Sequence, residues 1–88
     1  EYQLFYTNKA RRDLVKLSLK QRRIILDKLD YFIASGDPLK FAKKLVGRKL
    51  GEYRFRVGDY RAIFDIDKDG KVSVLMILTV KHRRDVYG

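Results

Sequence analysis

The chain has 88 residues and no cysteine, and its 21 Lys and Arg against 11 Asp and Glu give a formal net charge of +10. This length predicts a single domain over residues 1–88, and the lack of cysteine excludes disulfides and thiolate metal sites. We expect no membrane-spanning segment, because no apolar run reaches the length that a bilayer requires. The composition predicts a cytoplasmic protein whose positive field favours nucleic acid, a ribosomal surface, anionic lipid or an acidic protein.

The first part of the chain predicts a strand followed by two helices. Residues 2–6 are short and rich in aromatic side chains, which is typical of a strand. Thr7 and Asn8 are both suitable N-cap residues for the first helix, and Ser18 is one for the second, each followed by apolar residues at helical spacing. We expect Arg22 to face solvent, and a Ser-Gly-Asp-Pro segment to end the second helix. The predicted buried residues of the two helices are Ala10, Leu14, Leu17, Ile25, Leu29, Phe32 and Ile33.

The second part predicts three strands and completes the fold. They are expected at about 52–57, 60–66 and 72–79. Gly58-Asp59 is a two-residue turn, and residues 67–70 are predicted to form the next one. Residues 39–50 are expected to be irregular and basic, and residues 81–88 a polar tail. The order β-α-α-β-β-β predicts an α+β fold, in which a helical hairpin packs on one face of a small, mostly antiparallel sheet.

The stretch GEYRFRVGDYRAIFDI, residues 51–66, places like charges opposite each other. A two-residue turn pairs Arg56 with Arg61 and Arg54 with Ile63, and alternation puts all four side chains on one face. Opposed arginines destabilise a sheet, so this face is either a solvated surface or an anion-binding one. The surrounding segment is strongly basic, and arginine matches the oxygens of a phosphodiester, which favours anion binding. The opposite face, toward the helices, would carry Tyr53, Phe55, Val57, Tyr60, Ala62 and Phe64.

Candidates for proton transfer lie near the end of the chain. His82 is the only histidine and lies beside three cations in KHRRDVYG, where it is either an ordinary tail residue or a functional group. A cationic site without acids can still promote RNA cleavage by stabilising a pentavalent transition state while the 2′-OH attacks. Arginine cannot act as the base, which leaves Tyr87 and His82. The DIDKDG segment imitates an EF-hand loop but has Met76 in place of the final Glu, so we expect no metal site.

The motif YRFRVGDYRAIF, followed by HRRDVY after a strand and a helical hairpin, resembles the RelE/ParE toxin superfamily, and most of all its RelE branch. The resemblance covers essentially the whole chain. It implies a toxin of a type II toxin–antitoxin pair that cleaves messenger RNA in the ribosomal A site, with no metal or other cofactor. It also implies an acidic, RelB-like antitoxin that wraps the toxin, in a complex that is expected to be oligomeric.

The resemblance also assigns roles to single residues. Arg54 and Arg56 match two basic residues of a family strand, and Arg61 matches a phosphate ligand. Tyr87 matches a catalytic tyrosine, a candidate general base, and His82 or Arg83 falls near the family's remaining basic residue. Two alternatives stay open: a ParE-like toxin that poisons DNA gyrase, and a non-catalytic RNA-binding module. The residues that fit contacts to ribosomal RNA are Lys43, Lys44, Arg48 and Lys49.

Overall fold

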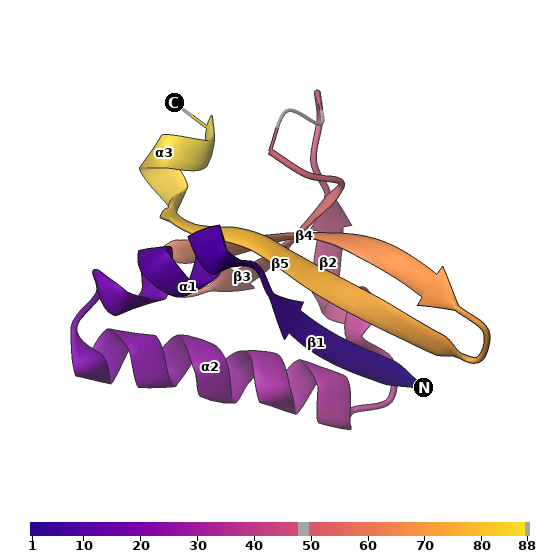
Figure 1. Ribbon diagram of the computed structural model, residues 1–88. Coiled ribbons are helices and arrows are strands. Elements are labelled where there is room, and N and C mark those ends of the chain that lie inside the picture. The colour runs from indigo at the N-terminus through magenta and orange to yellow at the C-terminus, as the bar shows by residue number, and fades with distance from the viewer. Residues whose placement is uncertain (48–49, 88) are drawn as a thin grey trace.

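The computed structural model describes residues 1–47 and 50–87, which form a five-stranded sheet with α1 and α2 packed against it (Figure 1). The elements are β1 (Tyr2–Tyr6), α1 (Asn8–Val15), α2 (Leu19–Ala34), the 3-10 turn η1 (Pro38–Phe41), β2 (Ala42–Lys44), β3 (Tyr53–Val57), β4 (Tyr60–Asp69), β5 (Val72–His82) and α3 (Arg83–Tyr87). The strand order is β1-β5-β4-β3-β2, and only β1 and β5 run parallel. The predicted α+β fold is confirmed.

Both long helices begin where the sequence predicts. Thr7 Oγ1 accepts a hydrogen bond from the amide of Ala10, and Ser18 Oγ accepts one from the amide of Gln21, both at 3.1 Å. Each bond satisfies an amide that has no partner within its own helix. The Thr7 cap fixes the start of α1 after β1, and the Ser18 cap fixes the short connection between α1 and α2, so the two helices form the predicted hairpin.

The prediction that Arg22 faces solvent is wrong. Its guanidinium is partly buried and donates to three carbonyl oxygens at the end of α1, with distances of 3.0 to 3.3 Å. The last carbonyls of a helix lack intrahelical partners, and a cation near them is favourable. Arg22 therefore ties the beginning of α2 to the end of α1. The accepting carbonyls belong to Leu14, Val15 and Leu17.

The core lies between the helices and one face of the sheet. Phe55 stacks on Phe32 of α2 and on Phe64 of β4, with ring centroids 4.9 and 4.4 Å apart. Phe32 also stacks on Phe41 of η1, at 4.6 Å. Complete burial of such a side chain stabilises the fold by roughly 1.5–3 kcal/mol. The predicted inward face of β3 and β4 is confirmed by the core residues Phe55, Val57, Ala62 and Phe64, against which Tyr53 and Tyr60 pack.

Four boundaries differ from the sequence prediction. Residues 42–44, predicted to be irregular, form the edge strand β2, and the predicted polar tail begins as strand and ends as α3. The turn predicted at residues 67–70 is instead at Gly70, because Asp69 still pairs with Val72. These errors share a physical cause, since short or polar strands are stabilised by pairing partners that local patterns do not reveal. No helix within the described ranges is long and apolar enough to cross a membrane.

Candidate anion-binding site

The β3–β4 hairpin has the predicted register. Its pairs are Val57–Tyr60, Arg56–Arg61, Phe55–Ala62, Arg54–Ile63 and Tyr53–Phe64. Gly58 adopts φ +60°, a left-handed conformation that favours glycine and fits the first central position of a two-residue hairpin turn. The two arginines at positions 56 and 61 therefore lie directly opposite each other on the sheet face away from α1 and α2.

A third cation extends this pair across the sheet. Because β5 continues to His82, Lys81 lies directly opposite Arg61. Its neighbour Val80 is buried in the core, so alternation places Lys81 on the other face, with the arginines. The sequence prediction missed Lys81 because it ended this strand at residue 79. The register of a longer strand would have revealed it.

Strand β2 adds a further cation to the same face. Lys43 pairs with Arg54, whereas Lys44 pairs with Tyr53 and so belongs to the opposite face. We call Lys43, Arg54, Arg56, Arg61 and Lys81 the basic face. Opposed like charges destabilise adjacent strands by less than about 1 kcal/mol per pair, so an anion that bound here would relieve a real repulsion.

The cations of the basic face differ in exposure. Arg56 and Lys43 are exposed, and Arg54 and Lys81 are partly buried. Arg61 is only 6% exposed, and its Nη1 donates to the carbonyl oxygens of Gly58 and Tyr60 at 3.0 and 2.9 Å. A fully solvated arginine face, one of the two expectations, is therefore wrong at Arg61. Its guanidinium is held beside the hairpin turn by these two hydrogen bonds.

One end of the basic face is bounded by the chain that leads into β3. A Cβ atom on Gly51 would lie 2.7 Å from Cγ2 of Ile63, so only glycine fits this close approach. The next amide, that of Glu52, donates to Oδ1 of Asp65 at 2.8 Å. Gly51 and Glu52 therefore cover Ile63, and they do not cover the part of the sheet that carries Arg56, Arg61 and Lys81.

The tail residues divide between the two faces. His82 pairs with Tyr60, their rings meet edge to face at 5.4 Å, and Nδ1 of His82 accepts a hydrogen bond from the amide of Arg84 at 3.3 Å. His82 therefore lies on the face opposite Arg56 and Arg61. Arg83 lies beside the hairpin turn, where its amide donates to the carbonyl of Asp59 at 2.7 Å and its guanidinium is 3.8 Å from the same residue's carboxylate.

Of the three remaining predicted site residues, the structure describes one in part and two not at all. Arg48 and Lys49 lie outside the described residues. Tyr87 is the last residue of α3, and the structure describes its backbone. The structure thus brings together Arg54, Arg56 and Arg61 and adds Lys43 and Lys81, while it separates His82 from them.

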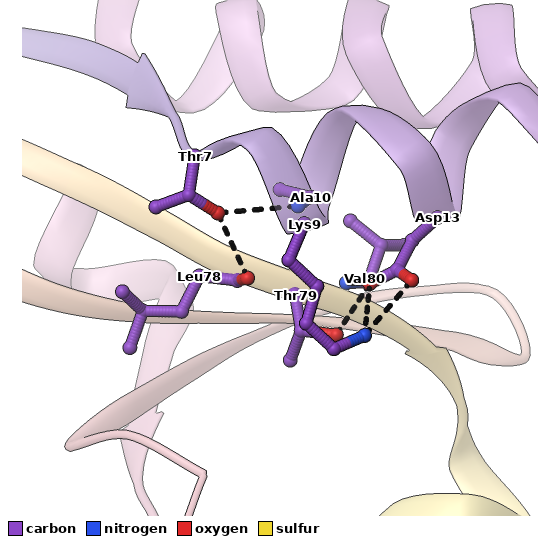
Figure 2. Close-up of polar contacts among 7 residues, drawn as sticks. All are labelled: Thr7, Lys9, Ala10, Asp13, Leu78, Thr79 and Val80. Atoms are coloured by element: carbon purple, nitrogen blue, oxygen red, sulfur yellow. Dashed lines mark hydrogen bonds and ion pairs between the residues drawn. The ribbon is translucent and has the colours of Figure 1, made fainter.

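The end of β5 is held in place by α1, which lies along it where β1 ends (Figure 2). Asp13 accepts hydrogen bonds from the amide of Val80, at 3.0 Å, from Thr79 Oγ1, and from Lys9 Nζ, at 3.0 Å. The register shifts in this part of β5, and the carboxylate binds the strand just before Lys81. Burial raises the pKa of Asp13, but these hydrogen bonds outweigh burial and leave the pKa below its ordinary value.

Comparison with known proteins identifies the family. Residues 4–87 match the family described as ParE toxin of type II toxin–antitoxin system, parDE. Toxin RelG of Mycobacterium tuberculosis is 34% identical over 88 residues, which cover 98% of this chain and 95% of that protein. The chain therefore belongs to the RelE/ParE superfamily of type II toxin–antitoxin toxins, as its motifs predicted.

Solved structures of similar sequence show the same fold. The toxin–antitoxin complex RelBE2 of Mycobacterium tuberculosis matches at 32% identity and a TM-score of 0.70, covering 93% of this chain and 98% of that chain. The archaeal RelE–RelB complex of Pyrococcus horikoshii OT3 matches at 28% identity and a TM-score of 0.64, covering 93% and 94%. The RelB–RelE complex of Methanococcus jannaschii matches at 26% identity and 0.59, covering 94% of both chains.

Proposed function

We propose that this toxin is an RNA endonuclease that cleaves messenger RNA in the A site of the ribosome. The observation that supports this proposal most is the row of three cations, Arg56, Arg61 and Lys81, on a sheet face that α1 and α2 do not cover. Several donors on rigid strands can hold one phosphate from different sides. The similarity to Toxin RelG and to RelE structures supports a place in the RelE branch, for which the sequence resemblance implied RNA as the substrate.

The proposed reaction uses the substrate's own nucleophile. The 2′-OH loses its proton and attacks the adjacent phosphorus, and the bond to the 5′-oxygen breaks. The products are a 2′,3′-cyclic phosphate and a 5′-OH, which takes up one proton. Arg56 and Lys81 would contact the non-bridging oxygens, with Arg54 and Arg61 adding charge that stabilises the transition state.

Two proton transfers complete the mechanism. Tyr87 is the proposed general base, and Lys81 is a candidate donor to the leaving oxygen, since an ammonium can release a proton and a guanidinium cannot. His82 remains the alternative proton donor, although it lies on the other face of the sheet, and Arg83 remains an alternative stabiliser of negative charge.

The proposed partners follow from charge and from the relatives. Lys43, Lys44, Arg48 and Lys49 would contact ribosomal RNA through its phosphates, and we propose that the toxin acts in the cytoplasm. The three similar solved structures are complexes of RelE with RelB, which supports an acidic RelB-like antitoxin as the partner of this chain. We propose that the complex with the antitoxin is oligomeric.

The test adds purified toxin to a translating extract and maps messenger ends by primer extension, with and without ribosomes. We expect cuts at A-site codons only when ribosomes are present. Arg56→Gln and Tyr87→Phe should weaken cleavage strongly, whereas Arg23→Gln, which removes the same charge from exposed α2, should not. Intact messenger with wild-type toxin, or equal loss in the Arg23 variant, would contradict the proposal.

A separate pair of variants tests the proton donor. Lys81→Arg keeps the charge opposite Arg61 but removes the ability to release a proton, so single-turnover cleavage should slow while RNA binding is retained. Lys81→Gln should lose both. If Lys81→Arg cleaves at the wild-type rate, another group is the donor.

A second candidate function is inhibition of DNA gyrase. The match of residues 4–87 to the ParE toxin family favours it. In a supercoiling assay, inhibition that persists in Tyr87→Phe, together with intact messenger in the extract, would support this function over RNA cleavage.

A further inference from the structure

A hollow with its own set of polar groups lies on the sheet face opposite the basic face, between α1, the end of β5 and α3. Its volume is about 310 Å³. The charged and aromatic groups that line it are Asp13, Lys16, Tyr60, Lys81, His82, Arg84 and Asp85. We call it the α1–α3 hollow. It lies on the other side of the sheet from Arg56 and Arg61, and it adjoins the basic face at Lys81, which borders both.

The charges of the α1–α3 hollow are only partly balanced. Lys16 and Arg84 are exposed, and the ion pairs found within residues 1–47 and 50–87, Lys9–Asp13 and Arg83–Asp59, involve neither. The carboxylate of Asp13 is already engaged by Val80, Thr79 and Lys9. Its negative charge is therefore largely satisfied within the protein. The remaining acid of the lining, Asp85, is exposed and is outnumbered by Lys16, Lys81 and Arg84, so the hollow can attract an external anion.

Aromatic rings form another part of the hollow. Tyr60 and His82 meet edge to face, with their planes at 74°, and both side chains are partly exposed. Since Nδ1 of His82 accepts from the amide of Arg84, the proton of the neutral ring is on Nε2, which becomes a donor. The hollow thus combines ring surface, hydrogen-bond donors and three cations.

We propose that the α1–α3 hollow binds one nucleotide unit of single-stranded RNA, with its phosphate at Lys16 and Arg84 and its base against Tyr60 and His82. Base stacking on aromatic rings together with phosphate contacts is the general mode of single-strand recognition. The volume is at the lower end of ligand pockets, roughly 300–1,000 Å³, which suits a single unit.

The chain itself connects this hollow to the basic face. Lys81 and His82 are consecutive residues of β5, paired with Arg61 and Tyr60 on alternate faces of the sheet, and both border the hollow. An RNA strand that crosses the end of the sheet would therefore contact Lys81 on one side and His82 on the other. This reading deepens the proposed function and relies on it for the source of the RNA.

The test is an NMR titration of ¹⁵N-labelled toxin with adenosine 5′-monophosphate, with inorganic phosphate and adenosine as separate arms. We expect amide shifts at Lys16, His82 and Arg84, with tighter binding of the monophosphate than of either fragment. Lys16→Gln should weaken binding at these amides roughly three- to five-fold, as expected for loss of one exposed charge contact. The matched control is Lys20→Gln, which changes an exposed lysine of α2 outside the hollow and should not weaken binding.

Three outcomes would overturn the inference. The first is amide shifts confined to the basic face, and the second is equal weakening of binding by Lys20→Gln. The third is inorganic phosphate that binds as tightly as the monophosphate, because the base would then have no role in the site. The test separates this inference from the proposed function. A toxin that leaves messenger intact but binds the monophosphate in the hollow contradicts only the nuclease, and the reverse result contradicts only the hollow.

Discussion

The two faces of the β3–β4 hairpin share the same strands and register, but one is stabilised by apolar packing and the other carries like charges that repel. On the helix side, Phe55 lies opposite Ala62, and both are fully buried in the core. One residue further along, Arg56 lies opposite Arg61 and like charges repel. The helix side therefore supplies the stability that lets the other side carry a destabilising arrangement. Local rules are expected to fail where function requires it.

The largest expected effect is on the helix side. Phe55→Ala removes a ring that is stacked between Phe32 and Phe64, and we expect it to lower the free energy of unfolding by about 3–5 kcal/mol. Urea denaturation followed by circular dichroism measures this. The control is Phe5→Ala, because Phe5 is 49% exposed and its loss should cost far less. Equal losses in the two variants would contradict the assignment of the core.

A smaller effect is expected at the contact between α1 and β5. Asp13→Asn weakens bonds to Thr79, Val80 and Lys9 and should lower the free energy of unfolding by about 1–3 kcal/mol at pH 7. Asp27→Asn, at an exposed position of α2, is the matched control. Comparable destabilisation by both variants would mean that the contact with β5 is unimportant.

The same variant predicts a pH dependence. The folded pKa of Asp13 lies below the ordinary value of 3.8, so its carboxylate stabilises the fold above that pH. This stabilisation is lost as the pH falls below 3.8 and through the folded pKa. The difference in stability between wild type and Asp13→Asn should therefore shrink under acid. A difference that stays constant down to acid unfolding would contradict the lowered pKa.

Substitution on the basic face is expected to have the smallest effect on stability, although it should have a clear effect on RNA binding. Arg56→Gln removes the repulsion with Arg61 and should raise the free energy of unfolding by less than about 1 kcal/mol. RNA binding should fall, and the slope of log affinity against log salt should decrease by about one unit. Filter binding over a range of salt concentrations measures both. If Arg56→Gln binds RNA as tightly as the wild type and as the Arg23→Gln control, the basic face does not contact RNA.

The sequence predicts elements whose signals are local and misses those that depend on partners. The hairpin register could be derived because a two-residue turn at Gly58 fixes every pair that follows. Strand β2 could not, since its three residues, including Lys43 and Lys44, carry no strand pattern and are ordered by pairing with β3. Lys81 and Arg22 were missed for the same reason. The position of Lys81 depends on how far β5 continues, and the position of Arg22 depends on carbonyl groups of the neighbouring helix.

The parallel pairing of β1 with β5 has a consequence for how the chain is made. Thr7 donates to the carbonyl of Leu78, which is 71 positions away, and Asp13 accepts from Val80, 67 positions away. Contacts this distant in sequence slow folding, and the early strand cannot find its neighbour until the last one has been synthesised. The nascent chain thus emerges without a finished sheet. Lys81 and His82, at the end of β5, are therefore fixed in place only after β1 and β5 have both been synthesised and have paired.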